Sequence, residues 1–109
     1  MLKNVLVDAV NYKVELTNEI LIVDGQEAGA TVEYNLGLIK IRNDKVVGEG
    51  VRAKLLMHEV MHALLHERGL VEASDDEQLV DALAAGVINL IRTNPALVDF
   101  ILKRSELNG

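Results

Sequence analysis

Three polar side chains stand close together in a strongly apolar stretch, and their types could hold a metal ion. In LLMHEVMHALLHERG, which begins at Leu55, the only polar residues up to Leu65 are His58, Glu59 and His62. Residues four apart on a helix project to the same side, so both imidazoles can place one nitrogen on a single ion. Glu59, one position further round, would reach a water molecule rather than the ion. This is the HExxH pattern of zinc sites.

The chemistry expected of such a site is hydrolysis of a peptide bond. Zinc lowers the pKa of its bound water to about 7. Glu59 would take up the proton of that water as it attacks a carbonyl, and would then pass the proton to the leaving amine. The alternative is a metal-free cluster in which the two histidines and the glutamate bond to one another in the core. The position of the motif inside a helix that is apolar on nearly every side favours metal binding.

A catalytic zinc usually has three protein ligands and one open position, so one more ligand is needed. The chain has no cysteine, which leaves a histidine or a carboxylate. His66 follows His62 by four residues, but three ligands at this spacing would spread over about 12 Å of one helix, which tetrahedral coordination does not allow. We therefore interpret His66 as a partly exposed residue near the helix C-terminus, where the helix dipole favours it.

Two carboxylates four residues apart follow in the next expected helix. Glu77 could be a ligand, or it could complete a capping box that begins at Ser74. Asp81 falls in line with Val80 and Ala84 on an apolar stripe, where an acid needs a partner. The pair suits a glutamate ligand together with an aspartate that orients an imidazole from outside the metal.

The elements that must position these residues follow from two kinds of periodicity. Up to about residue 45 the chain is strand-like, and strands are expected within 12–25, 30–35 and 38–43. Asp24-Gly25 interrupts the first stretch, and Asn43-Asp44 turns the chain after the last one. From about residue 50 the period becomes helical.

The helical part predicts three helices with clear start and stop signals. The first runs from Val51 to Arg68 and is ended by Gly69, the second runs from Ser74 to about Arg92, and the third begins at Asn94-Pro95 and covers 96–104. We predict a single α+β domain over 1–109, in which a small antiparallel sheet of two or three strands precedes the helices and the HExxH helix is central.

Composition narrows the class of protein. The chain has 109 residues, half of them apolar, which suffices for one compact domain. Its net charge of −6 and its scattered basic residues argue against nucleic acid as the main partner. The N-terminal residues do not resemble a signal peptide, and no stretch approaches the roughly 18 apolar residues of a membrane span. We expect a soluble cytoplasmic protein with no membrane partner.

The order of these motifs resembles the gluzincins, the thermolysin-like zinc peptidases. It is more closely similar to the ImmA/IrrE family of small zincin-like metallopeptidases, especially short phage- and prophage-encoded members. HEVMHALLH is similar to the HExxHxxxH helix of that family, and EQLVDALAA to the helix that follows it. YNLGLIKIRND and INLIRTNPALV are similar to segments of the short phage members. The resemblance covers roughly residues 30–100.

The resemblance implies a zincin-like fold, a Zn²⁺ cofactor and a role for each candidate residue. The implied ligands are His58, His62 and Glu77, the implied general base is Glu59, and Asp81 is implied to hold a ligand imidazole from outside the metal. It also implies a bacterial cytoplasm as the setting, with the chain encoded by a phage or prophage.

The expected activity is that of a zinc-dependent endopeptidase on a regulatory protein substrate. By the resemblance, the strand at 38–43 would lie at the sheet edge above the cleft, where a peptide could add as a further strand. No residue is clearly placed to stabilise the oxyanion, and Tyr34 and His66 are candidates. Leu83 stands where the family often has phenylalanine. The rival functions are a zincin-fold module that binds a partner without cleaving it, and a metal-free helical interaction domain.

Overall fold

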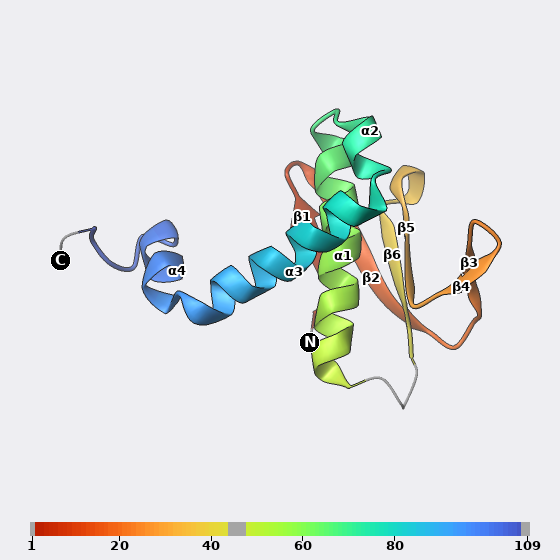
Figure 1. The fold of residues 1–109 in the computed structure, drawn as a ribbon, viewed down its shortest axis with the longest axis horizontal. Helices are drawn as coiled ribbons and strands as arrows, with labels where there is room; N and C mark the ends of the chain where they lie inside the picture. Colours follow the sequence, from red (N-terminus) through yellow and green to blue (C-terminus); the bar gives the residue numbers. More distant parts are fainter. Residues whose placement is uncertain (1, 44–47, 108–109) are drawn as a thin grey trace.

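The computed structural model of the chain describes residues 2–43 and 48–107, and it confirms the α+β prediction (Figure 1). The strands are β1 (Asn4–Val7), β2 (Val10–Thr17), β3 (Leu21–Val23), β4 (Gln26–Ala28), β5 (Ala30–Glu33) and β6 (Leu38–Arg42). The helices are α1 (Glu49–Glu67), α2 (Val71–Ser74), α3 (Glu77–Thr93) and α4 (Pro95–Ile101), and a 3-10 turn covers Tyr34–Leu36. The turn expected at Asn43-Asp44 lies partly outside the described residues.

The main sheet is mixed and has the strand order β1-β2-β6-β5. β2 and β6 are parallel, with Val14 opposite Ile39, whereas the two outer pairs are antiparallel. The prediction of two or three antiparallel strands is therefore wrong in number and in direction. The alternation of apolar and polar residues identifies a strand and its buried face, but it does not predict which strand pairs with it.

The edge position expected for the strand at 38–43 is also wrong. β6 lies between β2 and β5, so it is an interior strand, and β5 is the edge strand on that side of the sheet. The long connection between the parallel strands β2 and β6 explains this order, because β3, β4 and β5 all lie within it.

A separate hairpin of β3 and β4 projects beside the main sheet (Figure 1). Its turn residues Asp24 and Gly25 both have positive φ, 52° and 78°. Two consecutive left-handed residues form the tight turn that Asp-Gly favours between antiparallel strands. The interruption predicted there is confirmed, although the stretch 12–25 comprises two strands rather than one.

One face of the sheet packs against α1 and forms the main core. Tyr12, Ile39 and Ala63 are fully buried in it. The hydroxyl of Tyr12 donates a hydrogen bond to Glu67, which ties the C-terminal end of α1 to β2. A second cluster, centred on Met61, Val80 and Ala84, joins α1 to the N-terminal half of α3, and this contact is built from the apolar stripe that the sequence shows.

Of the three sequence signals for helix ends, those at Gly69 and at Asn94-Pro95 agree with the structure. Gly69 has φ 78° and follows α1, and the bonds from Gly69 N to His66 O and from Leu70 N to Leu65 O form a Schellman motif. Asn94 is the N-cap of α4 with Pro95 in its first turn, as predicted. α4 itself ends at Ile101, earlier than expected.

The capping box predicted at Ser74 is wrong. Asp76 is the N-cap of α3, and its side chain accepts a hydrogen bond from Leu79 N at 3.1 Å. Ser74 instead ends the short helix α2 and is buried. Glu77 is consequently the first residue of α3 rather than the third, and its carboxylate is not used in capping.

Candidate metal centre

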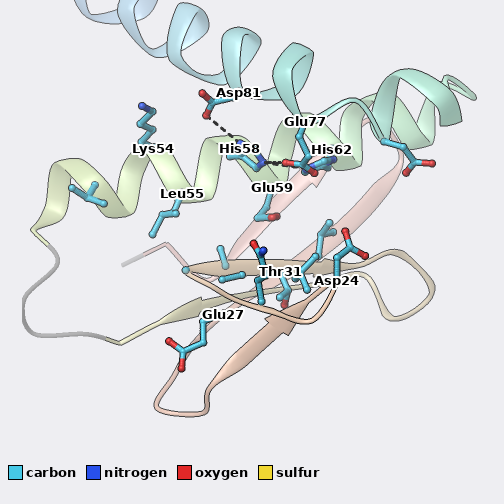
Figure 2. A pocket seen from close by; sticks show the side chains of 18 of the residues that line it. Asp24, Glu27, Thr31, Lys54, Leu55, His58, Glu59, His62, Glu77 and Asp81 are labelled. Carbon is cyan, nitrogen blue, oxygen red and sulfur yellow. Dashed lines mark hydrogen bonds and ion pairs between the residues drawn. The ribbon is translucent and has the colours of Figure 1, made fainter.

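The three predicted ligands come together where α1 and α3 meet (Figure 2). His58 and His62 lie one turn apart on α1, and Glu77 opens α3 opposite them. Each histidine Nε2 is 2.9 Å from an oxygen of Glu77, and the two Nε2 atoms are 3.1 Å apart. One possible donor atom from each residue lies within 4.8 Å of those of the other two, so this group can hold a metal ion.

The outer nitrogen of each imidazole faces an acceptor. His62 Nδ1 lies at hydrogen-bond distance from the carbonyl oxygen of Ser74. A carbonyl can only accept, so Nδ1 of His62 carries the proton and a neutral ring leaves its Nε2 free to bind a metal. His58 Nδ1 is 3.5 Å from Asp81 Oδ1. Metal-binding histidines typically have their second nitrogen held by a carbonyl or a carboxylate, and these positions are compatible with the role of Asp81, which stays a prediction.

The donor set fits a divalent cation. When Nδ1 is protonated on both rings, two nitrogen lone pairs and the carboxylate of Glu77 face one another at about 3 Å, which is unfavourable without positive charge between them. A proton on one ring would make a histidine–glutamate ion pair and satisfy the group in part. One metal ion satisfies all three groups, and two imidazoles with one carboxylate are a set that zinc accepts.

Glu59 lies beside the cluster with an unsatisfied oxygen. Its side chain is only 6% exposed, and among the described residues its Oε2 has no hydrogen-bond partner. Burial raises the pKa of its carboxyl group, the charges of His62 and His58 oppose the rise, and Glu77 adds to it. Figure 2 shows Glu59 projecting from α1 towards the strands. A buried carboxylate oxygen without a partner in the chain suits contact with a bound molecule.

These side chains open into a cleft of about 940 Å³. Its opposite wall is formed by the β3–β4 hairpin and by β5, which contribute Asp24, Glu27 and Thr31 (Figure 2). The α1 side adds Lys54 and Leu55. The hairpin was not expected at the site, although the Asp24-Gly25 signal identified its turn. No local sequence pattern predicts that a hairpin packs near a helix that lies thirty residues further along the chain.

Ser74 is a central residue of the site. Its local sequence predicts a helix cap and contains no indication of this role. Its hydroxyl donates to the backbone oxygen of His62 at 3.0 Å, and its carbonyl accepts from the ring of the same histidine. Tyr34 Oη lies 3.0 Å from Ser74 Oγ. Because the single proton of Ser74 is committed to His62, Tyr34 is the donor in this contact. Burial raises the pKa of the Tyr34 hydroxyl.

The two candidates for oxyanion stabilisation are placed differently. Tyr34 lines the cleft, but its proton points to Ser74. His66 lies in the last turn of α1, as predicted, and its ring stacks on that of Tyr34 with centroids 3.9 Å apart. His66 is not among the described residues that line the cleft, so its contact with the site is the ring stack on Tyr34.

Comparisons with known proteins do not assign the chain to a family. No protein-family model, no curated protein and no solved structure matches it. The zincin-like fold and the ImmA/IrrE resemblance therefore stay predictions that rest on the motifs. Within residues 2–43 and 48–107, no helix has the length and apolar character to cross a membrane.

Proposed function

We propose that this chain is a zinc-dependent metallopeptidase that hydrolyses a peptide bond in a protein substrate. The observation that supports the proposal best is the convergence of His58, His62 and Glu77 beside the buried, unpartnered oxygen of Glu59. A structural metal site needs no such carboxylate. The resemblance suggests a regulatory protein as substrate and the cytoplasm of a bacterial host as the setting.

In this proposal each side chain has a separate task. A zinc ion held by the three ligands would supply a Lewis acid that polarises a carbonyl and lowers the pKa of water. Glu59 accepts a proton from the attacking water and delivers it to the amine nitrogen as the peptide bond breaks. Asp81 and Ser74 are positioning residues, because each contacts the outer nitrogen of one imidazole.

The substrate would bind as an extended segment along β5. This strand pairs with β6 on one side only, and its residues Ala30, Thr31 and Val32 line the cleft. An exposed strand edge can accept a further strand through backbone hydrogen bonds. The peptide-binding edge predicted at 38–43 thus moves to 30–33, and it faces the candidate metal centre across the cleft (Figure 2).

The test compares the wild-type chain with Glu59→Gln on a mixture of unstructured peptides, with zinc per chain measured in both samples. We expect cleavage by the wild type and a rate at least about 100-fold lower for the variant, because the proton acceptor is lost. Zinc content should stay near one per chain, since Glu59 is not a ligand. Equal cleavage by both proteins would show that the proposed mechanism is wrong.

A second candidate is a module that binds a protein partner without cleaving it. The engaged proton of Tyr34 favours it, because among the described cleft residues this hydroxyl is the predicted oxyanion donor and it already bonds Ser74. This function would give a zinc-loaded chain that leaves the peptide mixture intact. Its binding to a partner would then be the same for the wild type and Glu59→Gln.

A further inference from the structure

The C-terminal part of the molecule forms a helical arm, defined here as residues 88–107. α3 crosses α1 with its N-terminal half, then continues beyond it, and α4 follows at the far end (Figure 1). The arm projects on the side of the molecule opposite the β3–β4 hairpin, which forms a wall of the cleft.

The apolar face of α3 continues past the helix that covers it. Val80 and Ala84 are fully buried against α1, and Val87 still packs on the same cluster. Ile91 continues this stripe one turn further and is 49% exposed, and Leu90 beside it is 52% exposed. A helix keeps an apolar face of this kind when something covers it.

α4 adds more apolar surface to the same arm. Leu97, Phe100 and Ile101 are 44%, 43% and 65% exposed. Phe100 is the only phenylalanine of the chain. Exposed apolar side chains of this size, gathered on two consecutive helices, are typical of an interaction surface on a folded protein.

The surface area and the radius of gyration show that the chain is less compact than a typical folded monomer of its size. A folded monomer of 12.0 kDa exposes about 6,000 Å², whereas this chain exposes 7680 Å². Its radius of gyration is 15.1 Å, against about 13 Å for a compact chain of this length. The excess of roughly 1,700 Å² belongs to the whole chain, of which the projecting arm is one part, and it is larger than the about 800 Å² that each partner buries in a standard interface.

We propose that a second copy of this chain covers the arm, and that the two arms pack on each other in a two-fold symmetric dimer. Charge favours this arrangement. Residues 88–107 contain three basic and two acidic residues, which give the arm a net charge of +1. Because the whole chain has a net charge of −6, the rest of the chain has a net charge of −7. The arm is therefore the region where two acidic chains approach without strong repulsion, and a two-fold contact places the same apolar surface on both sides.

The first test is the mass of the wild-type chain by light scattering, from about 1 to 100 μM. A dimer is expected, and a monomer at 100 μM overturns the proposal. Replacing Ile91 and Phe100 together by Asp should weaken dimerisation at least about 100-fold, because the dimer would bury unpaired carboxylates. The matched control is Leu6→Asp on β1, where Leu6 is 70% exposed outside the arm, and it should remain dimeric.

A second test does not depend on the folding of charged variants. The chain has no cysteine, so a single Cys introduced at position 90, 97 or 101 reports the contact directly. We expect mild oxidation to link chains at one or more of these arm positions and not at Leu6→Cys. Cross-linking at Leu6→Cys and at none of the arm positions would place the interface elsewhere and overturn the proposal.

Discussion

The body of the molecule, defined here as residues 2–43 and 48–87, and its helical arm differ in the contacts of their side chains. In the body, several buried polar groups have partners from distant elements, as when Ser74 holds His62 and Glu67 accepts from Tyr12. In the arm, large apolar side chains such as Ile101 remain exposed. Large apolar side chains such as Leu6 and Leu36 are exposed in the body as well, but those of the arm lie on two consecutive helices, where the proposed dimer would bury them.

This difference separates the residues of the proposed function from the residues of the proposed dimer contact. The candidate metal centre is formed by α1 and the start of α3, and its cleft is lined by the hairpin as well; all of these elements belong to the body. The arm contributes no ligand and lines no part of the main cleft among the described residues. Changes in one region should therefore leave the properties of the other intact, and three predictions examine that separation.

The largest effect is expected at the metal centre of the body. His62→Ala removes one ligand and its contact with Ser74, so zinc per chain should fall from about one to near zero after dialysis. His66→Ala is the matched control on the same helix, and it should keep its zinc because it stacks on Tyr34 outside the donor group. Elemental analysis of both variants measures the zinc content per chain. Equal loss of zinc from the control would refute the ligand assignment.

A smaller effect should distinguish packing in the two parts of α3. Val80→Ala opens a cavity in the contact with α1 and should lower the free energy of unfolding by about 2 kcal/mol. Leu90→Ala in the arm should change it by less than about 0.5 kcal/mol in dilute, monomeric protein. Denaturant titrations at low concentration measure both values. If the two variants lose the same free energy in dilute solution, the arm is packed against its own chain and the comparison fails.

The smallest effect concerns the alkaline stability of the body. Burial, followed by the bond to Glu67 and its charge, raises the pKa of Tyr12 above its usual value near 10. A raised folded-state pKa stabilises the fold below pH 10, and this contribution is lost as the pH rises above 10. Tyr12→Phe should cost about 1 kcal/mol at pH 8 through the lost hydrogen bond.

The difference between wild type and Tyr12→Phe should then narrow above pH 10, since only the wild type has this residue to ionise. Urea unfolding at pH 8 and pH 11 provides the comparison. Parallel loss of stability in both proteins would mean that the hydroxyl of Tyr12 ionises as easily in the folded chain as in the unfolded one.

Several local signals were sufficient to predict structure at single positions. Asp24-Gly25 predicted a turn, Gly69 the end of α1, and Asn94-Pro95 the start of α4. The physical reason is that each depends on the backbone geometry of a few neighbouring residues. Ser74 shows the limit of such signals, because a buried contact with His62 replaced the capping role that its immediate sequence predicted.

The amino-acid sequence by itself determined that His58 and His62 share one side of a helix with Glu59 one position further round, because helical spacing fixes these directions. It also supplied Glu77 as a candidate without showing that it meets them. Only the tertiary structure brought Glu77 to 2.9 Å from both imidazoles, through the packing of α3 on α1. The same holds for the edge strand, which is β5 and not β6. Strand order and helix crossing depend on contacts between residues far apart in the chain, and no local pattern encodes them.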